Sequence, residues 1–235
     1  MSGFIGEFFG TMILIVLGTG CGAAINLNKS YAKGSTWLYV TIAWGMAVTF
    51  GVYVASFLGS QGHLNPAVTI GFATFGYFPW SEVLPYLAGQ FLGAFVGAIL
   101  VIIQYYPHFE ATKNDEGNSI GIFATGPTIK NNLFNFLSET IATFVFVFCL
   151  LNLGDFDKGL KPFIVGVLIM VVGQALGGTT GFALNPARDW SPRLAYTILP
   201  VPNKGSANWG YAWVPMVGPI IGGILAAGLQ TILGK

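Results

Sequence analysis

Long apolar runs separated by short polar loops make up most of the sequence. A helix needs about 20 apolar residues to cross a bilayer core about 30 Å thick, and charge-poor windows of about that length occur six times. They cover residues 4–27, 37–58, 83–106, 133–153, 163–178 with an extension to 184, and 209–233. The pattern predicts an all-α membrane protein with six transmembrane helices.

Two shorter apolar stretches begin with the same tripeptide, Asn-Pro-Ala. Asparagine is a preferred N-cap, and proline fits the first position of a helix. The first stretch reaches Gly76 and Pro79 after about 11 residues, roughly 17 Å of helix, and the second is expected to end among the charged residues around Pro192. Both are therefore predicted to be re-entrant half-helices, which enter and leave the membrane on one side. The motifs are Asn65-Pro66-Ala67 and Asn185-Pro186-Ala187.

The order of these elements repeats once along the chain. Each half has a helix with one glutamate, a second helix, an Asn-Pro-Ala half-helix and a third helix; Glu7 and Glu139 are 132 positions apart and the two asparagines 120. Three spans per repeat is an odd number, so the repeats must insert with opposite topology, and their half-helices should meet near the midplane. We expect one transmembrane domain over residues 1–235, with repeats at about 1–106 and 132–235 and a connecting loop at about 107–131.

Composition supports a membrane protein and excludes some partners. The 235 residues are 54% hydrophobic and 8% charged, with a mean hydropathy of +0.68, and ordinary soluble domains do not have such values. A formal net charge of +1 gives no basis for a nucleic-acid partner, and no metal or cofactor is expected.

The charges of the loops give a poor guide to orientation. With a cytoplasmic N-terminus, three lysines lie on that side and seven basic residues on the other, which opposes the positive-inside rule. Arg188 and Arg193 are expected inside the protein, and without them five basic residues remain on the side opposite the N-terminus.

With its two Asn-Pro-Ala motifs, inverted repeat and six spans, the sequence resembles the major intrinsic protein (aquaporin) family over nearly its whole length. The second motif resembles the glycerol-facilitator branch, in which Asp follows Arg, as Asp189 follows Arg188 here. The pairs Pro192-Arg193 and Pro215-Met216 also resemble that branch, whereas the loop 59–64 is one residue longer than usual. The resemblance implies the aquaporin fold, a homotetramer with one pore per subunit, and cytoplasmic termini in a multi-pass protein of the cell membrane.

The same resemblance implies pore roles for particular residues. The selectivity filter would consist of Trp44, Gly173, Phe182 and Arg188, and the carbonyl groups lining the pore would be those of Gly62, His63, Leu64, Ala183 and Leu184. The residues themselves support part of this. The side-chain amides of Asn65 and Asn185 should keep two donors free for a permeating hydroxyl, and an arginine in so apolar a segment suggests a functional site, with a structural anchor as the alternative.

Glu7 and Glu139 lie deep in predicted spans, where a charge is costly. One hypothesis is a proton relay; the other, implied by the family, is structural support, with each carboxylate accepting hydrogen bonds from the loop before a half-helix. The repeat favours support because both halves need it. For Asp189 we favour a structural role over a simple counter-ion to Arg188.

The predicted function is a passive channel for glycerol, water and other small neutral solutes that excludes ions and protons. Urea, dihydroxyacetone or a protonated small acid would fit the same opening. A water-selective aquaporin and a proton-coupled secondary transporter are the alternatives. An enzyme is not expected, because the sequence offers no constellation of nucleophile, base or metal ligands.

Overall fold

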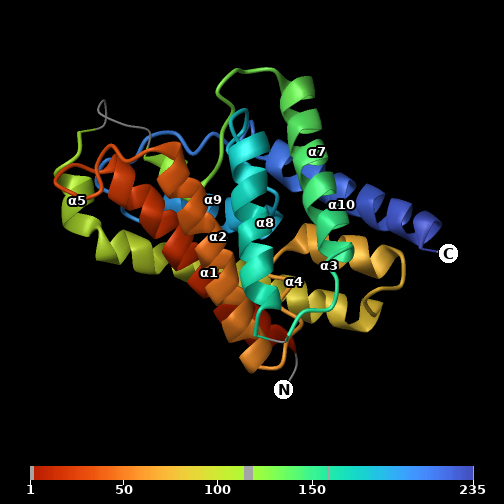
Figure 1. Ribbon diagram of the computed structural model, residues 1–235. Helices are drawn as coiled ribbons and strands as arrows, with labels where there is room; N and C mark the ends of the chain where they lie inside the picture. Colours follow the sequence, from red (N-terminus) through yellow and green to blue (C-terminus); the bar gives the residue numbers. More distant parts are fainter. Residues whose placement is uncertain (1–2, 114–118, 158, 235) are drawn as a thin grey trace.

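The computed structural model describes residues 3–113, 119–157 and 159–234. All regular secondary structure in these residues is helical, and Figure 1 shows how the helices cross. In chain order the helices are α1 (Gly3–Asn26), α2 (Trp37–Phe57), α3 (Pro66–Thr74), α4 (Trp80–Gln104), α5 (Tyr106–Glu110), α6 (Ile120–Phe123), α7 (Asn132–Leu151), α8 (Lys161–Leu176), α9 (Pro186–Ile198) and α10 (Trp213–Leu233).

Five of these helices, α1, α2, α4, α7 and α10, are long and apolar enough to cross a membrane. The sixth predicted span is α8, which is apolar but has only 16 residues, about 24 Å of helix. The predicted extension of this span to residue 184 is wrong: α8 ends at Leu176, and the chain continues through a turn into an irregular loop. The backbone N–H groups at the end of that loop bond to a glutamate side chain from α7, so they are not available to continue a helix.

The two short helices after the Asn-Pro-Ala motifs differ in length. Helix α3 has 9 residues, whereas α9 has 13 and runs through Pro192 to Ile198. The expectation that the charged residues end this helix is wrong, because Arg193 is fully buried and paired with Asp189, one turn earlier, at 2.7 Å. At about 20 Å, α9 is still too short to cross a bilayer.

Glycines bring the long helices into close contact in both halves of the chain. A Cβ at Gly89 in α4 would lie 2.6 Å from the carbonyl oxygen of Phe4 in α1, and one at Gly218 in α10 would lie 3.2 Å from that of Phe136 in α7. Small residues allow this approach, which is how helices pack well in lipid. Each half-helix packs on the third helix of the other half: α3 lies against α10, and α9 against α4.

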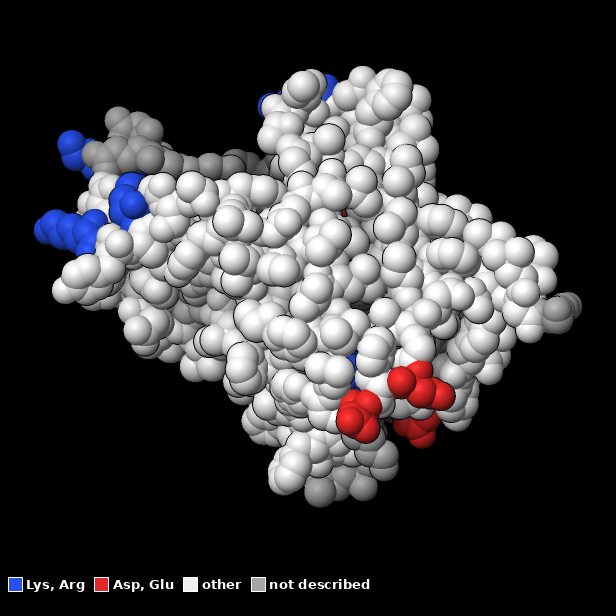
Figure 2. All heavy atoms as spheres, viewed as in Figure 1, with Lys and Arg blue, Asp and Glu red and all other residues white. Residues whose placement is uncertain are grey.

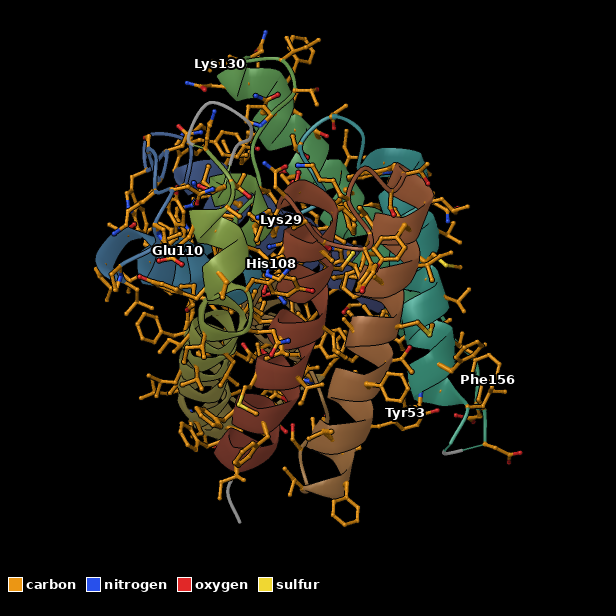
Figure 3. The ribbon with its side chains drawn as sticks, turned by 90° about the vertical axis from the view of Figure 1, so that its left-hand side faces the viewer. Lys29, Tyr53, His108, Glu110, Lys130 and Phe156 are labelled. Atoms are coloured by element: carbon orange, nitrogen blue, oxygen red, sulfur yellow. The ribbon has the colours of Figure 1, made fainter. Side chains whose placement is uncertain are left out.

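Charged residues gather at the two ends of the molecule. In Figure 2, most of the visible lysines and arginines lie at one end and the acidic residues at the other, with uncharged atoms between them. Figure 3 places Lys29 and Lys130 toward one end of the long helices and Phe156, which stands between Asp155 and Asp157, toward the other. Lys158 and Lys235, two of the three lysines assigned to the side of the N-terminus, lie outside the described residues.

Candidate pore

The two Asn-Pro-Ala motifs begin α3 and α9 with the same capping geometry. Each asparagine has an extended backbone and is followed by proline at the start of the helix. The side-chain oxygen of Asn65 accepts a hydrogen bond from the backbone N–H of Ala67 at 2.9 Å. That of Asn185 accepts two, from Ala187 at 3.0 Å and Arg188 at 3.1 Å. These bonds satisfy N–H groups that have no partner within the helix.

The side-chain amides of the two asparagines tie the motifs to each other. Asn65 Nδ2 donates to the carbonyl oxygen of Leu184 at 2.9 Å, and Asn185 Nδ2 donates to that of Leu64 at 2.7 Å. Both leucines have a left-handed backbone, with φ of 52° for Leu64 and 55° for Leu184. The expectation of two free donors per asparagine is therefore wrong, because one amide hydrogen is used across the junction. One hydrogen per asparagine remains.

The glutamates of α1 and α7 bind the loop before each motif. Glu7 is fully buried and accepts hydrogen bonds from the backbone N–H of His63 at 2.9 Å and of Leu64 at 2.7 Å. Glu139, also fully buried, accepts equivalent bonds from Ala183 at 2.9 Å and Leu184 at 3.0 Å. Side-chain donors add to both sets: Ser60 and Gln90 bond to Glu7, and Thr180 bonds to Glu139.

Asp189 does not form an ion pair with its neighbour Arg188 in the structure. One of its carboxylate oxygens accepts from Nε and Nη2 of Arg193 at 2.9 and 2.7 Å. The other accepts from the backbone N–H and the hydroxyl of Thr125 at 2.7 and 2.8 Å. The remaining donors of Arg193 reach three backbone carbonyls, so this buried pair joins α9 to the loops on either side of it. These carbonyls belong to Thr125, Ala207 and Asn208.

A narrow cavity of about 50 Å³ runs past the meeting point of the motifs. Most of its wall is apolar, and the polar side chains among its lining residues are those of His63, the two asparagines and Arg188. Such a wall with few polar groups suits a small, partly apolar solute. The lining residues are Leu14, Trp44, Val48, His63, Leu64, Asn65, Phe146, Ile169, Phe182, Ala183, Leu184, Asn185 and Arg188.

This cavity meets a wider vestibule of about 560 Å³ at three residues that line both spaces, namely Trp44, Phe182 and Arg188. We call these three residues the constriction. The guanidinium carbon of Arg188 lies 3.8 Å from the centroid of the Trp44 ring, within range of a cation–π contact. Nη1 of Arg188 donates to the carbonyl oxygen of Phe123 at 3.1 Å. Among the described residues, its other side-chain N–H groups have no protein acceptor, which leaves them for a solute.

Two of the predicted pore residues do not line the cavity or the vestibule. Gly173 lies behind Phe182, because a Cβ there would be 2.9 Å from two atoms of the phenyl ring. Its lack of a side chain makes room for that ring. Gly62 likewise faces Val52. The other four residues with predicted carbonyl roles line the cavity, although the carbonyls of Leu64 and Leu184 already accept the asparagine amides.

The apolar wall of the cavity was not predicted from the sequence; it consists of Leu14, Val48, Phe146 and Ile169. Leu14 and Phe146 are 132 positions apart, as the glutamates are, so the repeat identifies either residue from the other. His63 has the structural contacts expected of a residue that holds its loop. Its Nδ1 lies 3.1 Å from the Thr69 hydroxyl, and rings from Phe72, Phe78 and Tyr86 surround it.

Comparisons with known proteins agree with this arrangement. A family model described as Major intrinsic protein matches residues 1–229. The chain is 71% identical over 234 residues to Glycerol uptake facilitator protein 2 of Lactiplantibacillus plantarum, covering 99% of this chain and 100% of that protein. It is 37% identical over 228 residues to the D/L-lactic acid transporter of the same species, covering 95% and 94%.

The structure also resembles a solved one. It matches the X-ray structure of the aquaglyceroporin from Plasmodium falciparum with a TM-score of 0.83 and 31% identity, covering 97% of this chain and 93% of that one. Together with the six apolar helices and the paired half-helices, this likeness shows the aquaporin fold in an integral membrane protein. The chain belongs to the major intrinsic protein family.

Proposed function

We propose that this protein is a passive channel for glycerol, water and other small neutral solutes, with no catalytic activity. The constriction carries the proposal. Glycerol has a hydroxyl edge and a C–H edge; Arg188 offers donors to the first, and Trp44 and Phe182 offer an apolar wall to the second. A solute that loses water here gives up hydrogen bonds worth about 1 kcal/mol each in net terms, and the arginine replaces some of them. Several relatives are named as glycerol uptake facilitators, which supports the same solute class.

Exclusion of ions and protons follows from the helix ends at the midplane. The N-termini of α3 and α9 each carry partial positive charge, and each asparagine keeps one amide hydrogen for the solute. A cation therefore finds donors where it needs acceptors. A similar mechanism is generally given for aquaporins.

The contacts of the glutamates favour a channel over a proton-coupled transporter. Glu7 accepts four hydrogen bonds and Glu139 three, and the donors include two backbone N–H groups each. Neither glutamate lines the cavity or the vestibule. Their proposed role, like that of Asp189, is to hold the loops that form the pore. Other small neutral solutes in the proposal are urea, dihydroxyacetone and protonated acids.

The proposal includes a cell-membrane location, cytoplasmic termini and a homotetramer in which each subunit has its own pore. These points rest on family membership and on the apolar outer faces of the long helices. The charge count does not support the orientation. Crosslinking of the purified protein tests the tetramer, and protease accessibility of a C-terminal tag in intact cells tests the orientation.

Stopped-flow light scattering on proteoliposomes tests the function directly. An inward gradient of glycerol should cause shrinkage followed by reswelling that is fast relative to empty liposomes, linear in the gradient and independent of pH. Urea, dihydroxyacetone and lactic acid at low pH complete the solute panel. Fast water efflux without glycerol reswelling would favour a water-selective channel. Saturable uptake that depends on a pH gradient would favour a transporter.

A further inference from the structure

Phe182 reaches the constriction from a strained backbone. Its φ is 41°, in the left-handed region where residues other than glycine are uncommon. The equivalent position of the first half, 120 residues earlier, is Gly62, with φ of 69°. The same loop conformation is therefore easy in the first half and costly in the second. A conformation of this kind persists only where its surroundings impose it.

The surroundings of the Phe182 ring are close-fitting and come from two helices. Trp37, the first residue of α2, packs edge-on against the ring, with centroids 5.5 Å apart and planes at 84°. A Cβ at Gly177 would lie 2.6 Å from Phe182 Cδ1 and 3.0 Å from Cζ2 of Trp37. A methyl group at Gly177 would therefore clash with the rings of Phe182 and Trp37. We call Trp37, Gly173 and Gly177 the Phe182 socket.

A hydrogen bond ties the two sides of the socket together. Trp37 Nε1 donates to the carbonyl oxygen of Gly173 at 3.1 Å. The indole of Trp37 thus contacts the end of α8 through its N–H group and the phenyl ring of Phe182 through an edge-to-face contact. Trp37 is also seven residues before Trp44, two turns away on the same side of α2. One helix therefore supplies part of the constriction and the residue that holds another part of it.

We infer that Trp37 is a positioning residue for selectivity, which acts by fixing the Phe182 ring at the constriction. The inference rests on the proposed channel function. Trp37 is 42% exposed and lines the vestibule, so direct contact with a solute is the competing role. The two roles differ in one respect: positioning requires Phe182, and direct contact does not.

A double-mutant cycle separates the two roles. Trp37→Ala, Phe182→Ala and the double variant are reconstituted, and the ratio of glycerol to water permeability is measured for each in the same proteoliposomes. We expect Trp37→Ala to lower the ratio by about threefold or more, a size within the usual coupling of residues in contact. In the Phe182→Ala background the same change should have no further effect. An equal effect in both backgrounds would show direct contact, and no effect in either would show that Trp37 has no part in selectivity.

Two matched controls test the socket itself. Trp80 is also the first residue of a spanning helix and is exposed, and it lines neither space; Trp80→Ala should leave the ratio unchanged. Gly177→Ala should alter the ratio by displacing the phenyl ring. Gly178→Ala should not, because a Cβ at the adjacent Gly178 meets nothing within 4 Å. Equal effects of the two glycine substitutions would overturn the socket.

Trp37→Phe separates the ring contact from the hydrogen bond. It keeps an aromatic group beside Phe182 and loses the N–H group, so it should retain more of the ratio than Trp37→Ala. Size-exclusion profiles show which variants are folded. If the wild-type protein conducts water but not glycerol, the proposed function fails, but the role of Trp37 can still be tested from water permeability alone. In that case Trp37→Ala should change water permeability when Phe182 is present and leave it unchanged in the Phe182→Ala background.

Discussion

The two halves of the chain form the same pore centre but different pore ends. Near the junction the lining residues come in equivalent pairs, 120 positions apart in the loops and 132 apart in α1 and α7. At the ends the equivalence fails: Gly62 corresponds to Phe182, and Val68 to Arg188. The pairs at the centre are Leu14 and Phe146, His63 and Ala183, Leu64 and Leu184, and Asn65 and Asn185.

The difference follows from the backbone groups that each region of the pore has to satisfy with hydrogen bonds. At the centre, each half has to satisfy the free N–H groups of a half-helix without lipid or bulk water to help, and there are few ways to do so. A cap, a crossing amide and a buried carboxylate solve the problem in both halves. The constriction carries no such demand, because it borders the wide vestibule. The second half is therefore free to place an arginine and a strained phenylalanine there.

The supporting carboxylates show a smaller difference of the same kind. In the first half Gln90 Nε2 donates to Glu7 at 2.7 Å and to the Thr69 hydroxyl at 2.9 Å. The close contacts of Gly89 with α1 and of Gly218 with α7 align the next residue of each helix, so Pro219 stands where Gln90 does. Proline has no side-chain donor. Glu139 therefore depends more heavily on fixed backbone N–H groups.

The largest expected effect follows from this dependence. Glu139→Gln keeps one acceptor oxygen, for Thr180 and Ala183, but turns an amide donor toward the N–H of Leu184, which cannot turn away. Leaving such a buried donor unpaired costs about 1–3 kcal/mol. In Glu7→Gln the new amide meets the N–H of Leu64 in the same way, but the side chain of Gln90 can turn its oxygen toward that amide. We expect Glu139→Gln to lower the yield and the thermal midpoint of the folded protein clearly more than Glu7→Gln does.

Fluorescence-detected size exclusion after a temperature series measures this difference. Glu82→Gln is the control, since Glu82 is only partly buried, in the first turn of α4. Equal losses in the two buried variants would break the proposed distinction between the halves. A stable Glu139→Gln protein that had lost coupling to a pH gradient would support the transporter instead.

An intermediate effect is expected at the symmetric centre. Asn185→Asp keeps the cap, because aspartate is an equally good N-cap, but it cannot donate to the carbonyl oxygen of Leu64. The oxygens then face each other at the junction, and Asn65→Asp creates the same conflict with Leu184. Each substitution should cost roughly 1–3 kcal/mol and reduce glycerol and water flux together.

The measurement compares the glycerol and water permeabilities of these two variants. Permeabilities per folded channel should fall by similar factors in Asn65→Asp and Asn185→Asp, because the two amides make equivalent bonds. Wild-type flux in a well-inserted variant would show that the crossing amides are dispensable. A large loss in only one of them would show that the centre is less symmetric in function than in structure.

Local features of the sequence predicted more than long-range ones. The Asn-Pro-Ala caps depend on neighbouring residues alone, and the half-helices begin where the tripeptide indicates. The end of α8 could not be read locally, because Glu139, about 40 residues earlier, draws the loop N–H groups away from a helix. Arg193 marked a helix end by its charge, but Asp189 neutralises it inside the protein. Gly173 was placed in the filter by resemblance, and only the orientation of the Phe182 ring shows that it lies behind.

The smallest expected effect concerns selectivity and not folding, and it sharpens the contrast between the pore ends. Gly173→His alone would push against the Phe182 ring, whose atoms lie 2.9 Å from where the Cβ would be, so the informative background is Phe182→Ala. In that background the pore end is wide, and an imidazole at position 173 refills the space with a polar ring and a donor in place of an apolar wall. Water needs only donors and acceptors, whereas the C–H edge of glycerol needs the wall. Gly173→His in the Phe182→Ala background should therefore lower the ratio of glycerol to water permeability by about tenfold, or about 1.4 kcal/mol. Gly62→His places the same side chain in the first half, at the loop position that corresponds to Phe182 and faces Val52, and it should leave this ratio unchanged in channels that fold. If both substitutions change the ratio alike, the selectivity of the pore does not reside in the second half.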